Sequence, residues 1–388
     1  MPWRVAAVEE MRQEFCEEVE RGDRSVSAIC HAYGISRKTG YKWLKRYRCA
    51  GRLGLTDQRR TPRHHPQQVS AGVELRIVKL KRQYPYWGPR KLHRLLYDDY
   101  PNTERVAIST VARILARHNL VIPREEPVVY PTVGRFERAE PNDLWQMDLK
   151  MVRRQPDGRK RYVAGILDDH SRFVLGLWWL PDLTDSSVLA CWIDAAKQYG
   201  LPRETLTDHG SQFRMVEHTT STFRTHLWAC GVDHTQARVG HPQTQGKIER
   251  FWSTLQRELT PQLDVAPPSR WPVLMEQWRI QYNRRRPHEA LNDATPASRY
   301  RTSPRRYVEP DRCARIGLPT SIYRPVSIKG EVSLGARPVT IGRGLFGWTV
   351  EARPLGNGCW HIYFRNHFLR EVLLTTEPKS VTHVPVQV

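Results

Sequence analysis

The sequence predicts a multidomain α+β protein. Its expected parts are tandem helix–turn–helix units, a central α/β mixed-sheet core and a small antiparallel β-barrel at the C-terminus. The 388 residues exceed what one ordinary hydrophobic core can hold, so two to four domains are expected. Helical periodicity fills the first 120 residues, and strand-like alternation begins near residue 144. After about residue 326, glycine-containing turns separate short apolar runs, which is typical of small β domains.

The composition favours a polyanionic partner. The chain has 61 Lys+Arg against 40 Asp+Glu, a formal net charge of +21. Nucleic acid is the simplest partner for such an excess, although membrane-surface and ribosomal proteins are also basic. No apolar run has the length of a membrane span, and the N-terminal stretch has no apolar secretory core, so we expect a cytoplasmic protein with no membrane partner. The seven cysteines form no C-x-x-C pair, so neither zinc nor a disulfide framework is expected.

Residues 1–55 are predicted to form a helix–turn–helix domain. A helix is expected over 9–21 and two more within 25–48, with Ser25 and Ser36 as N-caps and Gly34 in the turn. The last of these helices begins with polar and basic residues, which would meet phosphates and base edges. A small helical hairpin without DNA is the alternative, and the net charge favours DNA binding. The residues expected at this interface are Arg37, Lys38, Thr39 and Lys42.

A second helical unit is expected after a basic linker over 56–70. The linker is either simply solvated or tracks a phosphate backbone, and these two interpretations are compatible. The second unit covers 71–125, with helices over 74–85, 87–100 and 107–120 and Ser109 as the expected cap of the last. Arg90 and Lys91 follow a Gly-Pro helix start, so they are further candidates for DNA contact. Residues 126–140 form a second linker.

The central domain is expected over 141–300. Three strands at 144–154, 161–169 and 172–180 are followed by alternating helices and strands, and this order predicts a mixed sheet with helices on both faces. The later elements are a helix over 186–199, a strand over 204–208, a helix ending near 229, a strand over 232–237, a helix ending near 259 and a further helix within 269–291. A connector over 301–325 leads to the β-rich domain over 326–388.

Three acidic residues are predicted to converge at one end of this sheet. Asp148 lies on the polar face of the first strand, Asp208 ends the fourth strand, and Glu249 lies in the first turn of the helix that follows the fifth. Clustered carboxylates repel one another without a cation, and hard oxygen ligands select Mg²⁺ or Mn²⁺. Two such ions, roughly 3.5–4 Å apart, promote in-line phosphoryl transfer. Taken singly, each acid is more simply explained as a solvent-facing strand residue, a turn former or a surface glutamate. The order of the three acids and the charge together favour a metal site.

The segments that carry these acids resemble a known family. LWQMDLK, LTDHGSQF and HPQTQGKIERF are similar to the three motifs of the DDE transposase and retroviral-integrase superfamily. YNRRRPHEALN (282–292) resembles a stretch just after the core of bacterial insertion-sequence transposases. GISRKTGYKWLKRY and YWGPRKLHRLL resemble the tandem DNA-binding units of that group. The similarity runs through roughly residues 1–300 in order, whereas the C-terminal β segment matches less clearly.

The resemblance implies a ribonuclease H-like core in which Asp148, Asp208 and Glu249 are the catalytic residues and hold two Mg²⁺ ions, with Mn²⁺ as a substitute. It implies a transposase that binds the terminal inverted repeats of its element. Water would attack at the element end to free a 3′ hydroxyl, and that hydroxyl would then attack target DNA without a covalent enzyme–DNA intermediate. Pairing two ends requires at least a dimer on DNA. The expected setting is the bacterial cytoplasm, in association with the nucleoid. The residues expected against DNA near the reacting phosphate are His241, Gln243, Gln245, Lys247 and Arg250.

The chain departs from the family pattern in two places. The interval between Asp208 and Glu249 is longer than usual, which predicts a small insertion within 214–226, and His209 stands where Asn is usual. The His/Cys zinc motif of retroviral integrases is absent, which favours the bacterial branch. Asp168 and Asp169 are interpreted as turn formers.

Two other functions stay open. One is a metal-dependent, structure-selective nuclease on the same fold, which would hydrolyse but not join nucleic acid. The other is a non-catalytic DNA-binding regulator derived from a transposase. Two sequence-reading units argue against the nuclease, and an intact acidic triad argues against the regulator.

Overall fold

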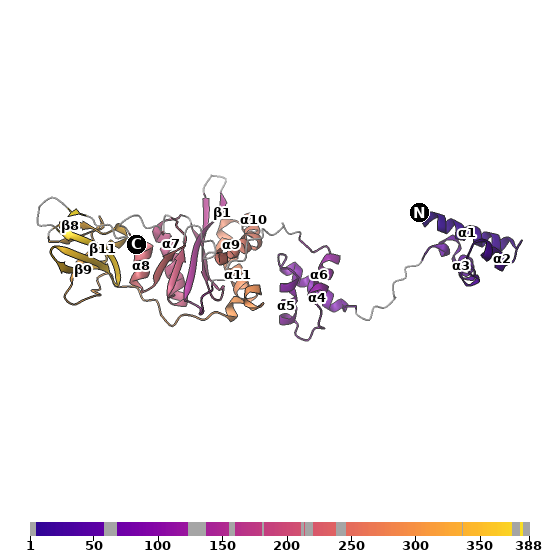
Figure 1. Ribbon diagram of the computed structural model, residues 1–388, viewed down its shortest axis with the longest axis horizontal. Coiled ribbons are helices and arrows are strands. Elements are labelled where there is room, and N and C mark those ends of the chain that lie inside the picture. Colours follow the sequence, from indigo (N-terminus) through magenta and orange to yellow (C-terminus); the bar gives the residue numbers. More distant parts are fainter. Residues whose placement is uncertain are drawn as a thin grey trace. The chain divides into compact units, whose positions relative to one another are not determined.

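The computed structural model describes residues 5–57, 68–122, 137–154, 160–180, 182–210, 213, 220–237, 246–335, 337–374 and 381–382. The chain divides into two compact units, Met1–Val69 and Ser70–Val388. Figure 1 labels the helices and strands of both units.

The N-terminal unit is a helix–turn–helix, as predicted. It consists of α1 (Val5–Arg21), α2 (Val26–Ala32) and α3 (Arg37–Ala50), followed by a short 3₁₀ turn. The hydroxyls of Ser25 and Ser36 accept hydrogen bonds from the backbone N–H groups of Ala28 and Thr39, so both expected N-caps are confirmed. Gly34 has φ +63° in the turn, a conformation that glycine adopts without strain.

Close packing of α3 against α1 and α2 depends on Gly40. A Cβ at this position would lie 2.4 Å from Cys30 Sγ and 2.9 Å from Phe15 Cζ. A larger residue would therefore push α3 away from its neighbours. The opposite face of α3 stays in solvent and carries the basic side chains, whereas its inner face joins the core of the unit. That core is formed by Phe15, Cys16, Ile29, Cys30, Trp43, Leu44 and Leu55.

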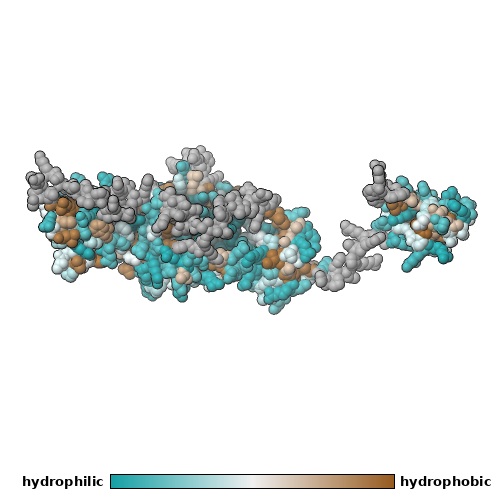
Figure 2. Space-filling model, in the orientation of Figure 1, coloured by the Kyte–Doolittle hydropathy of each residue, from teal (hydrophilic) through white to brown (hydrophobic). Residues whose placement is uncertain are grey.

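The second unit begins with three helices, α4 (Ala71–Gln83), α5 (Pro89–Asp99) and α6 (Ile108–Arg117). Pro89 occupies the first turn of α5 after the N-cap Gly88, as the sequence predicts. The expected cap at Ser109 is wrong, because α6 already begins at Ile108 and its N-cap is Ala107. Figure 2 shows apolar residues on the surface of this region. The large exposed apolar side chains here include Leu75, Ile108, Val121 and Ile122.

A five-stranded mixed sheet forms the centre of the molecule. Its strands are β1 (Leu144–Arg154), β2 (Lys160–Asp168), β3 (Val174–Leu180), β4 (Glu204–Thr207) and β5 (Asp233–Gln236), in the order β3-β2-β1-β4-β5. β1, β2 and β3 pair antiparallel, whereas β4 runs parallel to both β1 and β5. The predicted meander followed by strand–helix alternation is thus confirmed.

Helices cover both faces of this sheet, as expected (Figure 1). α7 (Asp185–Tyr199) and α8 (Thr222–Ala229) pack on the face that carries Trp145 and Met147. α9 (Gly246–Glu258), α10 (Thr260–Val265) and α11 (Trp271–Arg284) pack on the face that carries Val163 and Leu167. α11 ends before Arg286-Pro287, because the residue preceding a proline is disfavoured in a helix.

The C-terminal domain is antiparallel. Its strands are β6 (Ile322–Pro325), β7 (Glu331–Leu334), β8 (Arg337–Thr340), β9 (Thr349–Gly356), β10 (Cys359–Phe364), β11 (His367–Leu374) and β12 (Val381–Thr382). They pair as one sheet of order β12-β11-β10-β9-β6 and a separate β7-β8 ribbon, so the described strands do not show the closed barrel that the sequence predicts. The Trp228 ring of α8 stacks on His367 at 4.2 Å, which joins this domain to the core. None of the described helices has the length and apolarity needed to cross a membrane.

Candidate active site

Asp148 lies in the middle of β1 and faces α9. Strand alternation sends its neighbour Met147 into the core under α7, so the Asp148 side chain leaves the opposite face. The indole Nε1 of Trp252 donates to Asp148 Oδ2 at 2.8 Å, and the backbone N–H of Leu149 donates to Oδ1 at 2.7 Å. Both carboxylate oxygens are therefore oriented by the protein.

Asp208 reaches the same level because of the register between two parallel strands. Leu144 pairs with Glu204 and Gln146 with Leu206, so continuing the register by two residues brings Asp208 beside Asp148. Neighbouring strands lie about 4.8 Å apart. Burial raises the pKa of Asp148, and the negative charge of Asp208 raises it further. The two carboxylates thus form a like-charged pair at one end of the sheet.

Glu249 lies one helical turn before Trp252, in the first turn of α9, and is exposed. The close approach of α9 to the sheet depends on Gly165, which is the register partner of Asp148 on β2. A Cβ on Gly165 would lie 2.9 Å from Trp252 Cη2 and 3.2 Å from Phe251 Cε1. A larger residue there would lift α9, and with it Glu249, away from Asp148.

The three acids form an open arrangement. Their carboxylate oxygens do not all lie within 4.8 Å of one another. Among the described residues, the one group of His, Cys, Asp or Glu side chains that meets this criterion is in the C-terminal domain. Asp148 is held by two donors, and Asp208 Oδ1 accepts from the backbone N–H of Gly210 at 2.9 Å. Glu249 is exposed, so it is the acid whose side chain can rotate most freely. Its role as the third ligand stays a prediction.

A buried ion pair fixes the first turn of α9. Lys247 Nζ lies 2.5 Å from Asp169 Oδ2, and the two side chains are 11% and 0% exposed. Asp169 also accepts from Gln146 Nε2 and from the backbone N–H of Arg138, both at 2.8 Å. Burial lowers the pKa of Lys247, whereas Asp169 opposes that shift. The pair therefore ties the end of β2 to the helix that carries Glu249, and the DNA contact expected for Lys247 stays a prediction.

Asp168 stabilises the turn that follows β2, as the sequence suggests. Its carboxylate accepts from the backbone N–H of Ser171 at 2.8 Å, the Ser171 hydroxyl at 2.5 Å and the backbone N–H of Asn142 at 2.7 Å. The sequence does not show the role of Asp169, because its partners belong to other elements. They come from β1 and from α9, and the partner on α9, Lys247, lies 78 residues further along the chain. The Asp-Asp dipeptide at a strand end was the available signal, and it indicated only a turn.

The residues predicted to contact DNA differ in their surroundings. Arg37, Lys38 and Lys42 are exposed on α3, Arg250 is exposed on α9, and Thr39 Oγ1 lies 2.9 Å from Ser36 Oγ.

Within the second unit, Arg90 is engaged by Glu289 and Asp293, each at 3.0 Å, in the stretch after α11, and Lys91 is half-buried. His209 Nε2 lies 2.5 Å from the carbonyl oxygen of Ala237. His241, Gln243 and Gln245 lie outside the described residues, as does 214–219 of the predicted insertion.

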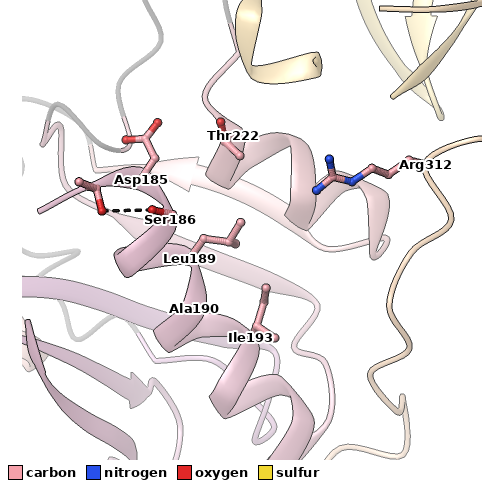
Figure 3. A pocket seen from close by; sticks show the side chains of 8 residues that line it. Asp185, Ser186, Leu189, Ala190, Ile193, Thr222 and Arg312 are labelled. Atoms are coloured by element: carbon pink, nitrogen blue, oxygen red, sulfur yellow. Dashed lines mark hydrogen bonds between the residues drawn. The ribbon is translucent and has the colours of Figure 1, made fainter. Parts of the chain in front are cut away.

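A separate hollow of about 510 Å³ lies at the beginnings of α7 and α8 (Figure 3). Asp185 and Ser186 line it from α7, Thr222 from α8, and the Arg312 side chain extends toward it from the connector. None of the three acids contributes to it. The candidate active site therefore lies beside β1 and the end of β4, and not in this hollow.

Comparisons with known families match both the N-terminal helical part and the central sheet of the chain. The Integrase core domain family matches residues 138–242, and a second family of the same description matches 230–296. The Helix-turn-helix domain family matches 11–63 and the Homeodomain-like domain family matches 39–115, which indicates DNA binding by the N-terminal part.

Individual relatives are distant. The 39.2 kDa protein of insertion element IS476 from Xanthomonas euvesicatoria is 24% identical over 61% of this chain and 68% of its own length. The transposase for transposon Tn552 from Staphylococcus aureus is 22% identical over 62% of this chain and 54% of its own length. The HTLV-2 integrase catalytic core domain in complex with magnesium aligns at a TM-score of 0.34 and 17% identity, covering 42% of this chain and 97% of that one, a likeness too low to imply more. The chain therefore contains an integrase core domain, matched over 138–296, and is similar to proteins of bacterial insertion elements and transposons in the DDE integrase superfamily.

Proposed function

We propose that this protein is a DNA transposase that binds the terminal inverted repeats of its element and catalyses 3′-end cleavage and strand transfer into target DNA. One observation carries the proposal. Asp148 and Asp208 lie level on adjacent parallel strands, and the helix that carries Glu249 packs against the same strand. This arrangement supports the proposal that three acids far apart in sequence act together beside β1 and the end of β4.

The residues present fit divalent cations. The donors are carboxylate oxygens alone, which are the ligands that Mg²⁺ and Mn²⁺ prefer. The like charges of Asp148 and Asp208 raise the pKa of Asp148, and a cation between them would reverse that repulsion. We assign the metal ligands as Asp148, Asp208 and Glu249, which would hold two Mg²⁺ ions; bound there, the ions would supply activation of the attacking oxygen and stabilisation of the leaving oxygen.

The protein's own groups position these ligands. Trp252 and the backbone of Leu149 fix the two oxygens of Asp148, so its carboxylate does not need to reorganise during the reaction. The Asp169–Lys247 pair holds the start of α9, which sets where Glu249 can reach. In the proposed reaction, water attacks the phosphodiester at the element end and the 3′ hydroxyl leaves. That hydroxyl then attacks a target phosphodiester and displaces the 3′ oxygen of the target strand.

The remaining domains would bind DNA. We propose that residues 1–55 and 71–125 read the inverted repeat in two pieces, joined by the basic linker 56–70, while 141–300 is the catalytic core, preceded by the linker 126–140 and followed by the connector 301–325 and the β domain 326–388. The exposed basic side chains of α3 are suited to phosphate contact. Two ends require two active sites, so the functional form is at least a dimer on DNA, associated with the bacterial nucleoid.

A strand-transfer assay tests the proposal. Purified protein is incubated with labelled duplex carrying the inverted repeats that flank its gene, a plasmid target, and either Mg²⁺ or Ca²⁺. Joined product that requires Mg²⁺ and disappears in Glu249→Gln is the expected result. The matched control is Glu276→Gln, because Glu276 is an exposed glutamate on α11 that pairs with Arg279 and should leave joining unchanged.

The two alternative functions give different results in the same assay. Cleavage without joining would mean a structure-selective nuclease. Tight binding of the ends with no chemistry under any condition would mean a DNA-binding regulator, and the assignment of the three acids would then be wrong.

A further inference from the structure

Three side chains of different chemistry meet on one face of the C-terminal sheet. Cys359 and His361 lie on β10, and Glu371 lies on the neighbouring strand β11. One donor atom from each, a sulfur, a nitrogen and an oxygen, lies within 4.8 Å of the others. No other group of three or more His, Cys, Asp or Glu residues is that compact within the described ranges.

Strand geometry produces this cluster. Residues two apart on a strand share a face, so Cys359 and His361 both project from β10 on the side opposite Ile362. The antiparallel register pairs His361 directly with Glu371, which places the carboxylate on the same face. Ile362 and Phe364 are fully buried in the core of the domain, so the strand that presents the cluster is firmly anchored. β10 also has hydrogen-bonded neighbours on both sides, β9 and β11.

An ion pair between His361 and Glu371 explains only part of this arrangement. His361 Nε2 lies 2.7 Å from Glu371 Oε2, which is an ordinary cross-strand interaction. The Cys359 thiol is a third potential metal donor, and the nearby Glu371 carboxylate disfavours the ionisation of this thiol. Burial raises the pKa of that thiol, and the Glu371 charge raises it further. A cation bound by all three groups would convert the unfavourable neighbour into a shared ligand.

We propose that Cys359, His361 and Glu371 form a Zn²⁺ site, with water as the fourth ligand. Thiolate, imidazole and carboxylate together are a donor set typical of zinc, whereas Mg²⁺ selects oxygen donors. Zinc–ligand distances of about 2.0–2.3 Å in a tetrahedron require donor atoms about 3.5 Å apart, which small side-chain rotations within this cluster provide. Binding displaces the thiol proton of Cys359.

The linear spacing of the cysteines gave no sign of such a site, because its ligands pair across strands and only one of them is a cysteine. The site is chemically distinct from the three acids of the core. It does not depend on the proposed transposase activity. Its effect would be to join β10 to β11 in a small domain, for which a metal adds stability that a limited core cannot supply.

Cobalt titration of the full-length protein tests the proposal. Co²⁺ bound by a thiolate gives an intense sulfur-to-metal charge-transfer absorbance in the near ultraviolet, which all-oxygen sites do not give. We expect a saturable band that disappears on addition of Zn²⁺ and persists in excess Mg²⁺. Cys359→Ser should abolish the band, and Glu371→Gln should weaken Co²⁺ binding by at least about tenfold.

The matched control is Cys313→Ser, since Cys313 is likewise a free cysteine, is exposed and lies outside the cluster. This variant should keep the band. Far-ultraviolet circular dichroism confirms that each variant is folded, and Glu371→Gln preserves the shape of the side chain if Cys359→Ser does not fold. Absence of the band in the native protein, or an identical band in folded Cys359→Ser, would overturn the proposal.

Discussion

The core contains two pairs of aspartates in opposite situations. Asp168 and Asp169 are fully buried at the end of β2, and donors from the chain surround both carboxylates. Asp148 and Asp208 are only partly buried and face each other. Asp148 lies on β1, three positions beyond the level of Asp168, and Asp208 lies just beyond the end of β4.

The causes of the pKa shifts differ between Asp168 and Asp148. Burial raises the pKa of both, and hydrogen bonds oppose that shift in both. Only for Asp148 does the charge of a neighbouring acid, Asp208, add to the shift. Acids surrounded by donors hold the fold together, and acids that face each other are available to a cation.

The largest expected effect is on chemistry. Asp148→Asn or Asp208→Asn should lower strand transfer at least about a thousandfold, equivalent to about 4 kcal/mol, because each removes a metal ligand. Single-turnover cleavage and joining in Mg²⁺ measure it. The control is Asp233→Asn, an exposed aspartate at the opposite end of the same sheet, which should retain native rates. Native rates in the Asp148 or Asp208 variants would remove both acids from the mechanism.

The second effect is on stability and concerns the other pair. Asp169→Asn or Lys247→Met should each lower the free energy of unfolding by roughly 3 kcal/mol, because each leaves one buried charge without its partner. The double variant should lose less than the sum of the two, since no unpaired charge remains. Denaturant unfolding of all four proteins gives the coupling energy, and strictly additive losses would contradict a direct interaction.

The third effect depends on pH. The pKa of Asp148 is raised in the folded protein above its ordinary value of 3.8, so its ionisation opposes folding. The contribution of Asp148 to the free energy of unfolding is fully present when the pH is below that ordinary pKa, and it is lost as the pH rises through the raised pKa. Asp148→Asn should therefore be more stable than the native protein near pH 7, and the difference should vanish in acid. Unfolding measured in metal-free buffer from pH 3 to 7 tests this, and the opposite slope would refute it.

The smallest effect comes from one hydrogen bond. Trp252→Phe keeps an aromatic ring in the core but removes the donor to Asp148, so it should cost about 1 kcal/mol of stability. That donor lowers the pKa of Asp148, so the acid limb of the rate profile should move to higher pH. Trp278→Phe is the control, because Trp278 Nε1 has no hydrogen-bond partner in the described part of the chain. A shift in both variants would mean general loosening of the core.

Much of the fold follows from local patterns in the sequence. Alternation placed Asp148 on the polar face of β1, and caps and glycines located the helix–turn–helix. The order of elements predicted a mixed sheet. What local patterns could not supply was contact between distant segments. In the sequence, Gly165 is only a small residue within a strand. Its importance becomes apparent in the structure, where it lies opposite Asp148 and α9 packs over it.

The same limit explains the remaining differences. Lys247 follows a glycine at the start of a helix, which favours a surface position, yet its partner Asp169 comes from another strand and draws it into the interior. The DNA contact of Arg90 stays a prediction, and local patterns did not show that two acids, 199 and 203 residues later in the chain, engage its side chain. The prediction of a closed barrel was based on turn spacing alone, and turn spacing does not determine whether the edge strands pair with each other.

The pairing of β1 with β4 and the late position of α9 and α11 in the chain also determine the order in which the parts of the protein can fold during synthesis. The N-terminal unit ends at Val69 and has its own core, so it can fold as soon as it leaves the ribosome. The face of the sheet that carries Val163 and Leu167 is covered only after α11, which ends at Arg284, has been made. At about 5–20 residues per second, that interval lasts roughly 10–40 s. A growing chain with the proposed function would therefore be able to hold DNA well before it could break it.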